Sequence, residues 1–201
     1  MCLERYWNMS YKEAWDNYYR AGYTSGAGSY GRLAEFKAQT INEFITDHGI
    51  QTVLDIGCGD GNQLSFLNCK EYFGVDVSPT AVELCKKKFS SDPTKHFSLY
   101  SPNGKNDLPE CDLVLCLDVL YHIIPEEDFN QTLDDIFSHA KKGVILYTVL
   151  LDIGTKNEHI YTRNTIQYLE NYPDWEIWKI IYQKYPKKSG ADFLILKPCQ
   201  R

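Results

Sequence analysis

Three glycines at alternate positions follow an acidic residue at the end of a short apolar segment. The segment is residues 52–56, with Asp55 near its end, and Gly57, Gly59 and Gly61 come after it. Glycine allows a tight turn and lets backbone N–H groups approach a ligand closely. Open parallel sheets bind ligands at the carboxyl ends of their strands. The spacing therefore predicts a ligand-binding turn at the end of a buried strand.

A second acidic residue, Asp76, ends the next apolar run, residues 72–76, and lies 21 positions after Asp55. One loop, one helix and a return strand need an interval of about this size. A carboxylate suits a vicinal diol because its oxygens only accept hydrogen bonds while both hydroxyls donate them. A dinucleotide-binding turn would have its third glycine at position 62, where Asn62 stands, so this alternative is weakened.

With these two motifs the sequence resembles the class I S-adenosylmethionine-dependent methyltransferases, in which an acid and GxGxG end the first strand. The resemblance implies that the glycine turn faces the methionine and ribose portions of S-adenosylmethionine. It also implies that Asp55 orients the amino-acid end and that Asp76 accepts from the ribose hydroxyls. Residues 112–122 are similar to the fourth-strand motif of small methyltransferases found among sugar- and capsule-modifying enzymes. The cofactor-binding residues that we expect are Asp55, Gly57, Cys58, Gly59, Gly61, Asp76, Val77 and Asp118.

Candidate catalytic residues follow the predicted fourth strand. Methyl transfer from a sulfonium is an in-line displacement, so the protein must align the acceptor and, where needed, remove a proton. Asp118, Tyr121 and His122 come after residues 112–117. The ordinary pKa of histidine suits a general base, which makes His122 the first candidate. The alternative is a buried histidine or tyrosine that only bonds the backbone.

Two further candidates follow the predicted fifth strand. His159 is a catalytic candidate, and Arg163 is a candidate for binding the acceptor. The planar guanidinium suits a carboxylate or phosphate, so the acceptor could be a phosphorylated metabolite or a nucleotide sugar. A purely structural salt bridge of Arg163 is the alternative.

The glycine-rich segment 22–31 precedes the first core helix and is a candidate lid. In a lid, Tyr30 would pack on the ligand, and Arg32 or Lys37 would meet a carboxylate. A mobile linker is the alternative. The segment lacks the Gly-Lys-Ser/Thr ending of a P-loop, so ATP binding is not supported. Aromatic residues are concentrated in residues 6–30 and 161–185, which favours a pocket or lid built by the two ends of the chain. A surface patch that binds another protein is the alternative.

The pattern of elements predicts a doubly wound, Rossmann-like α/β fold. Strands alternate with helices, which is typical of a parallel sheet with helices on both faces. A C-terminal hairpin, joined by a turn at 186–190, adds an antiparallel strand to give a mostly parallel seven-stranded sheet. We expect an N-terminal helix and glycine-rich lid segment, residues 1–31, and a methyltransferase domain, residues 32–201, which together form a single compact domain. The predicted strands are 52–56, 72–76, 96–100, 112–117, 143–149, 175–182 and 193–196, and the predicted helices are 33–45 and those beginning near Gly61, Ser78 and Pro125.

Composition and charge limit the classes of function that we expect for this protein. The 201 residues carry a net charge of −6, which disfavours nucleic acid as a partner. The seven cysteines include no CxxC pair, so neither a disulfide framework nor a metal site is expected. No apolar run is long enough to cross a bilayer and no signal core is present, so we expect a cytoplasmic protein. The oligomeric state is not defined by the sequence.

These observations lead to one main hypothesis and two alternatives. The main hypothesis is methyl transfer from S-adenosylmethionine to a small molecule, specifically a hydroxyl of a sugar or nucleotide sugar. One alternative is a protein or RNA methyltransferase, which would present a flat, charged groove. The other is a non-catalytic S-adenosylmethionine-binding accessory protein, which would bind the cofactor without transferring its methyl group.

Overall fold

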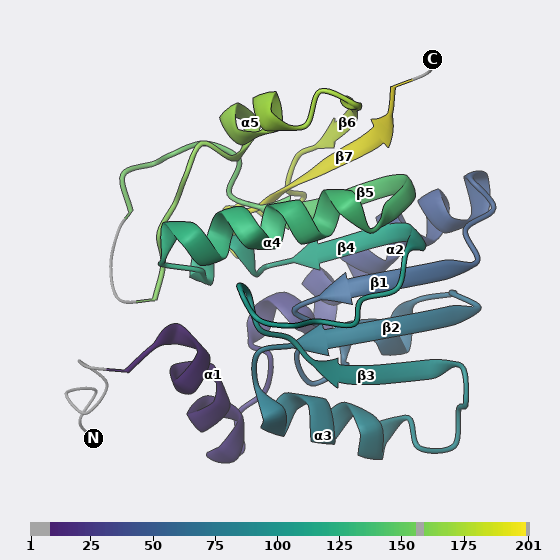
Figure 1. Cartoon of the computed structure of the whole chain (residues 1–201), viewed down its shortest axis with the longest axis vertical. Coiled ribbons are helices and arrows are strands. Elements are labelled where there is room, and N and C mark those ends of the chain that lie inside the picture. The colour runs from purple at the N-terminus through teal and green to yellow at the C-terminus, as the bar shows by residue number, and fades with distance from the viewer. Residues whose placement is uncertain (1–8, 156–158, 200–201) are drawn as a thin grey trace.

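A single seven-stranded sheet forms the centre of the molecule in the computed structural model, which describes residues 9–155 and 159–199. The strand order is β3-β2-β1-β4-β5-β7-β6 (Figure 1). The first five strands in this order are parallel, and β7 runs antiparallel to both β5 and β6. The predicted Rossmann-like fold with its antiparallel C-terminal hairpin is therefore confirmed. The strands are β1 (Thr52–Ile56), β2 (Glu71–Asp76), β3 (Lys95–Leu99), β4 (Cys111–Leu117), β5 (Ala140–Thr148), β6 (Trp175–Ile181) and β7 (Asp192–Pro198).

Helices cover both faces of the sheet, and each buries an apolar stripe. Helix α2 contributes Ile41 and Phe44 to the core on one face, and α4 contributes Phe129 and Leu133 to the core on the other. Figure 1 shows α4 in front of the sheet and α2 behind it. The α-helices are α1 (Tyr11–Arg20), α2 (Gly31–Asp47), α3 (Pro79–Lys88), α4 (Glu126–Ser138) and α5 (Thr165–Tyr168), with short 3-10 helices at Ala27–Ser29, Gln63–Phe66, Leu120–His122 and Leu169–Asn171.

Local signals explain where the helices begin. Ser78 caps α3 by accepting from the Ala81 N–H at 3.1 Å, and Pro79 occupies the first helical position. Ser10 and Glu13 form a capping box at the start of α1. The division into a lid segment, residues 1–31, and a domain, residues 32–201, stays a prediction, and residues 1–8 of that segment, Tyr6 among them, lie outside the described part of the chain.

The helix predicted near Gly61 is wrong, because the chain forms only the 3-10 helix Gln63–Phe66 before it enters β2. Nine residues separate Gly61 from Glu71, which leaves too little chain for a helix and its return. The Asn42 side chain of α2 fixes this connection instead. Its amide donates to the Phe66 carbonyl at 2.8 Å, and its oxygen accepts from the Asn68 N–H at 2.8 Å.

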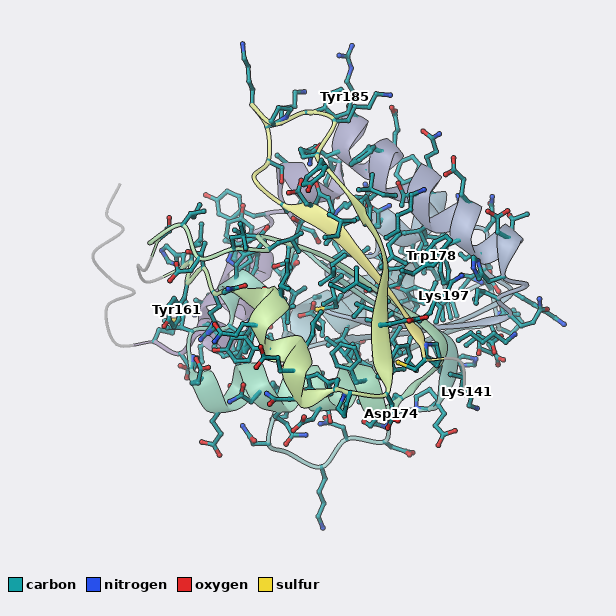
Figure 2. All side chains as sticks on the ribbon, turned by 90° about the horizontal axis from the view of Figure 1, so that it is seen from above. Lys141, Tyr161, Asp174, Trp178, Tyr185 and Lys197 are labelled. Atoms are coloured by element: carbon teal, nitrogen blue, oxygen red, sulfur yellow. The ribbon has the colours of Figure 1, made fainter. Side chains whose placement is uncertain are left out.

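The C-terminal hairpin packs its outer strand against α2. Trp178 of β6 lies 5.7 Å from Phe44 and 5.2 Å from His48, measured between ring centroids. The Lys197 ammonium of β7 sits 3.8 Å from the Trp178 ring centre, and Figure 2 shows the two side chains together. These contacts close the sheet at the end remote from β3. Among the described residues no helix is long and apolar enough to cross a membrane.

Candidate functional site

A cavity opens at the carboxyl edge of the sheet, where the strand order reverses between β1 and β4. The space at this edge, including open solvent at the mouth, is about 810 Å³. The strand-end residues that the sequence singled out and that line this cavity are Asp55, Gly57, Cys58, Gly59, Asp76, Val77, Asp118 and His122.

The glycine turn has a backbone that only glycine fits. Gly57 has a φ of +88°, and a Cβ there would lie 2.2 Å from Cγ2 of Val119. Gly59 has a φ of +57°, and its Cβ would lie 2.2 Å from Oγ of Ser25. These positive φ values are costly for other residues. The turn is held close to β2 because the Gly57 N–H donates to the Val75 carbonyl at 2.8 Å.

Asp76 connects the end of β2 to the glycine turn. Its carboxylate accepts from the Gly59 N–H and from the Ser78 N–H, each at 2.9 Å. Burial raises the pKa of Asp76 to about 6, against the lowering effect of these two bonds. The carboxylate is therefore fixed in orientation at the cavity wall, where a ligand's hydroxyl groups could donate to it.

Asp55 and Gln63 present buried acceptor atoms to the same cavity. Tyr72 donates its hydroxyl to Oδ2 of Asp55 at 2.6 Å, whereas Oδ1 has no hydrogen-bond partner among the described residues. The side-chain oxygen of Gln63 also has none there. An unpaired buried acceptor is costly, so these atoms suit a ligand that donates hydrogen bonds. S-adenosylmethionine carries an ammonium group and two ribose hydroxyls as donors, so the residues present fit it.

The two buried carboxyls predict opposite pH trends for stability and for cofactor affinity. Burial raises the pKa of both Asp55 and Asp76 from 3.8 to about 6. The two protonated carboxyls therefore make their full contribution to the free energy of unfolding below pH about 4, and this contribution is lost as the pH rises through about 6. Ionised Asp76 accepts from the ribose hydroxyls, so affinity for S-adenosylhomocysteine should increase over the same rise.

Calorimetric titration with S-adenosylhomocysteine between pH about 5 and 7 measures the affinity. Thermal melts of the ligand-free protein over the same range measure the stability. Asp76→Asn cannot ionise and should flatten the affinity curve, and Asp55→Asn should reduce the loss of stability. An affinity that is constant with pH in the unmodified protein would contradict the assignment.

Asp118, at the end of β4, lies where several segments converge. Its backbone φ is +60°, an uncommon value for a residue other than glycine. The buried Lys37 ammonium lies 2.7 Å from Oδ2, and the Tyr121 hydroxyl donates to Oδ1 at 2.8 Å. Lys37 thus meets a carboxylate, as the sequence suggested, but the carboxylate belongs to the protein. Arg32, the other cation suggested for this role, is exposed on α2.

His122 is held in one tautomer at the cavity wall. Its Nδ1 lies 2.7 Å from the His159 carbonyl oxygen, which can only accept, so Nδ1 carries the proton and Nε2 is the basic nitrogen. Burial lowers the pKa of His122 below its usual 6.5, which keeps the ring neutral. Trp15 packs edge-on against the ring with centroids 5.0 Å apart. A neutral, oriented imidazole can accept a proton from an acceptor group.

Five of the predicted site residues do not line the cavity. Tyr121 donates to Asp118, and burial raises its pKa well above the usual value, so its hydroxyl stays protonated and is a poor base. The His159 side chain is exposed, and its backbone serves His122. Tyr30 faces a neighbouring surface groove and donates to Asp60 at 2.8 Å. The five residues are Gly61, Tyr121, His159, Tyr30 and Arg163.

The Arg163 side chain is buried and bonds other parts of the protein. Its guanidinium is buried and donates to the carbonyls of Ile123 and Ile124, each at 2.8 Å, and to the Glu126 carboxylate at 2.9 Å. It also stacks 3.9 Å from the centre of the Tyr161 ring, which Figure 2 labels. The donors proposed for an acceptor phosphate are thus engaged with the segment that follows His122.

Arg163→Met should lower the free energy of unfolding by about 3 kcal/mol, because the change removes the donor to two backbone carbonyls and one of the donors to the Glu126 carboxylate. The affinity for S-adenosylhomocysteine should stay within about twofold, since the guanidinium does not line the cavity. Denaturant melts and calorimetric titration measure the two quantities. Arg32→Met, at an exposed position, is the control and should change stability by less than about 0.5 kcal/mol. A loss of affinity with unchanged stability would return Arg163 to the ligand site.

Helix α1 closes the cavity with an aromatic wall and is fastened at two places. The Asp16 carboxylate accepts from the Ser78 hydroxyl at 2.8 Å and from the Thr80 N–H at 3.0 Å, at the start of α3. Tyr11 donates to Asp128 of α4 at 3.0 Å. Figure 1 shows α1 on the side of the sheet to which the arrowheads of β1, β2 and β4 point. The residues of α1 that line the cavity are Tyr11, Trp15 and Tyr19.

Comparisons with known proteins agree with this geometry. The family model described as a methyltransferase domain matches residues 54–146, just under half of the chain. The ubiquinone biosynthesis O-methyltransferase of Schizosaccharomyces pombe is 37% identical over 84 residues, 38% of this chain and 30% of that protein. The tRNA U34 carboxymethyltransferase of Colwellia psychrerythraea is 33% identical over 134 residues, 62% of this chain and 39% of that protein. The chain thus spans between 30% and 39% of the length of these two relatives.

Solved structures share the fold over nearly the whole chain. The magnesium protoporphyrin IX methyltransferase of Synechocystis, with bound S-adenosylhomocysteine, has a TM-score of 0.68 at 16% identity and covers 94% of this chain and 100% of its own. The N-methyltransferase NodS of Bradyrhizobium japonicum, with the same ligand, has a TM-score of 0.67 at 14% identity and covers 84% and 88%.

The fold is that of solved S-adenosylmethionine-dependent methyltransferases. Within this fold, residues 54–146 match the family described as a methyltransferase domain.

Proposed function

We propose that this protein binds S-adenosylmethionine in the cavity and transfers its methyl group to a hydroxyl of a small molecule, specifically a sugar. The proposal rests on two features that line the same cavity. One is the glycine turn bonded to Asp76, and the other is the neutral, oriented ring of His122. The first suits the cofactor and the second suits proton removal from an acceptor.

The cofactor would be held by the strand-end residues. Asp76 would accept from the ribose hydroxyls, and Asp55 with Gln63 would accept from further donors of the ligand. When bound, S-adenosylmethionine supplies an electrophilic methyl group on a sulfonium, and the electron pair of the broken C–S bond stays on sulfur. Gly57 and Gly59 leave out the side chains that would clash with Val119 and Ser25 at the cavity wall.

His122 would take the acceptor proton. The proton of the acceptor hydroxyl would pass to Nε2 of His122. The hydrogen bond of Nδ1 to the His159 carbonyl holds the ring in the required tautomer during this transfer.

The aromatic wall supports a small acceptor over a macromolecular one. Tyr11, Trp15 and Tyr19 of α1 line the cavity, whereas a protein or RNA acceptor would need an open, charged groove. The faces of a sugar ring carry C–H groups that pack on aromatic rings, and its hydroxyls donate to carboxylates. The net charge of −6 further disfavours an RNA backbone.

Transfer of labelled methyl groups tests this proposal. The purified protein is incubated with methyl-labelled S-adenosylmethionine and a size-fractionated cell extract, and the label is followed by mass. Label in a small molecule is the expected result. Label in protein or RNA would show that the acceptor is a macromolecule. Cofactor binding without any labelled product would indicate a non-catalytic, accessory role.

A further inference from the structure

Lys37 and Asp118 line the cavity, and Tyr121 bonds Asp118 from outside the lining; the proton transfer described above does not use this cluster. The Lys37 side chain is 0% exposed and its ammonium lies 2.7 Å from Asp118, whose side chain is 14% exposed. A lysine is almost never fully buried unless it is paired. The pair is therefore a built feature of the site rather than a chance surface contact.

Two side chains bond the Asp118 carboxylate, and the glycine-rich segment lies against it. Lys37 comes from α2, Tyr121 from the 3-10 helix after β4, and the backbone of Asp118 itself has a φ of +60°. A Cβ on Gly28, in the glycine-rich segment, would lie 2.7 Å from Oδ2, so that segment also closes on the carboxylate. Strained backbone of this kind persists where the surrounding structure over-determines it, and such positions concentrate at functional sites. The remaining side of Asp118 lines the cavity.

The charges on the cavity wall show which acceptors it can take. Three carboxylates, those of Asp55, Asp76 and Asp118, stand against one ammonium, that of Lys37, which gives a net charge of −2 with neutral His122. S-adenosylmethionine adds one positive charge, so the loaded cavity stays negative. The ammonium of Lys37 is already paired with Asp118. A phosphate or carboxylate on the acceptor would meet like charge in a poorly solvated space, which is strongly unfavourable.

We propose that Asp118 binds the acceptor by accepting a hydrogen bond from its hydroxyl or amine, that Lys37 positions Asp118, and that the acceptor is an uncharged or cationic small molecule. This inference rests on the proposed methyl transfer. It replaces the phosphorylated metabolite or nucleotide sugar expected from Arg163, and it assigns Asp118 to the acceptor rather than to the cofactor.

The charge of the methylated product is the first test, because it can be read without knowing the product's identity. The labelled small-molecule fraction made by the unmodified protein is passed over an anion exchanger at pH about 7. Label in the flow-through is the expected result. Label that is retained, and that flows through after phosphatase treatment, would overturn the inference while leaving methyl transfer intact. Absence of label from every fraction would instead reject the proposed function, and the inference with it.

Variants of the ion pair test the two residues separately. With the active extract fraction as acceptor, Asp118→Asn and Lys37→Met should each need about tenfold or more of that fraction to reach half-maximal methyl transfer. An effect of this size is expected for the loss of a hydrogen bond to a charged group. Affinity for S-adenosylhomocysteine should stay within about twofold in both. Lys37→Arg, which keeps the cation, should restore most of the acceptor affinity. Lys86→Met, at a half-exposed lysine on α3, is the matched control and should leave transfer unchanged.

A purely structural role would give a different pattern. Because a buried carboxylate without its cation can unfold the protein, the double variant Lys37→Met with Asp118→Asn removes both charges and keeps the site neutral. It should bind S-adenosylhomocysteine normally and still fail to saturate with acceptor. Normal saturation in Asp118→Asn, or loss of S-adenosylhomocysteine affinity in that variant while it remains folded, would overturn the inference, the second result by returning Asp118 to the cofactor.

Discussion

Asp76→Ala is expected to lower the affinity for S-adenosylhomocysteine by about 30- to 1,000-fold at neutral pH. Hydrogen bonds to a charged group contribute about 1.5–3 kcal/mol each, and the change removes the acceptor for the ribose hydroxyls. It also releases the Gly59 and Ser78 N–H groups, which bond the carboxylate at 2.9 Å, so the glycine turn loses one of its connections to β2. Isothermal titration calorimetry of the folded variant measures the effect directly.

The control for this prediction is a carboxylate with similar structural bonds at the opposite edge of the sheet. Asp112 accepts from the Gln51 N–H at 2.8 Å and pairs with Lys142 at 3.2 Å, both far along the strands from the cavity. Asp112→Ala should cost stability without changing affinity. If Asp76→Ala bound the ligand as tightly as the unmodified protein, the cofactor would lie elsewhere in the molecule.

The sheet was predictable from sequence because its strands are short apolar runs with local end signals. The central strand β4 is almost entirely buried, and its predicted range 112–117 differs by one residue from Cys111–Leu117. The start of the fifth strand is not marked by such an apolar pattern. It begins at Ala140 rather than at residue 143, because exposed Lys141 and Lys142 at the sheet edge hide its start from an apolar pattern.

The candidate site was predictable only where one local segment builds it. The glycine turn and its following acid belong to one β-turn-β unit, so their spacing alone brings Gly59 and Asp76 together. The pair of Lys37 with Asp118 joins residues 81 positions apart, and no periodicity marks it. The partners of Arg163 could not be predicted for the same reason, since the two carbonyls lie 39 and 40 positions earlier in the chain. The aromatic wall of α1 was signalled only by the density of aromatic residues near the N-terminus.

His122→Gln should reduce methyl transfer by about 10²- to 10⁴-fold and leave the affinity for S-adenosylhomocysteine within about twofold. General-base catalysis contributes a factor of this size. Glutamine can still donate to the His159 carbonyl and so keeps the local structure, but it has no basic nitrogen. Labelled methyl transfer into the active small-molecule fraction measures the rate.

The pH profile separates a base from a residue that only supports the fold. Burial holds the pKa of His122 below its usual 6.5, so the ring is neutral at pH 7 and the rate of the unmodified protein should fall only as the pH drops below that value. In His122→Gln this acid limb should disappear together with most of the rate. A variant that kept the limb would assign it to another cavity group, of which Asp55 and Asp76, with pKa values of about 6, are the nearest in range. Cofactor affinity distinguishes these cases, because ionisation of the two aspartates changes binding, whereas protonation of His122 changes only the transfer that follows it.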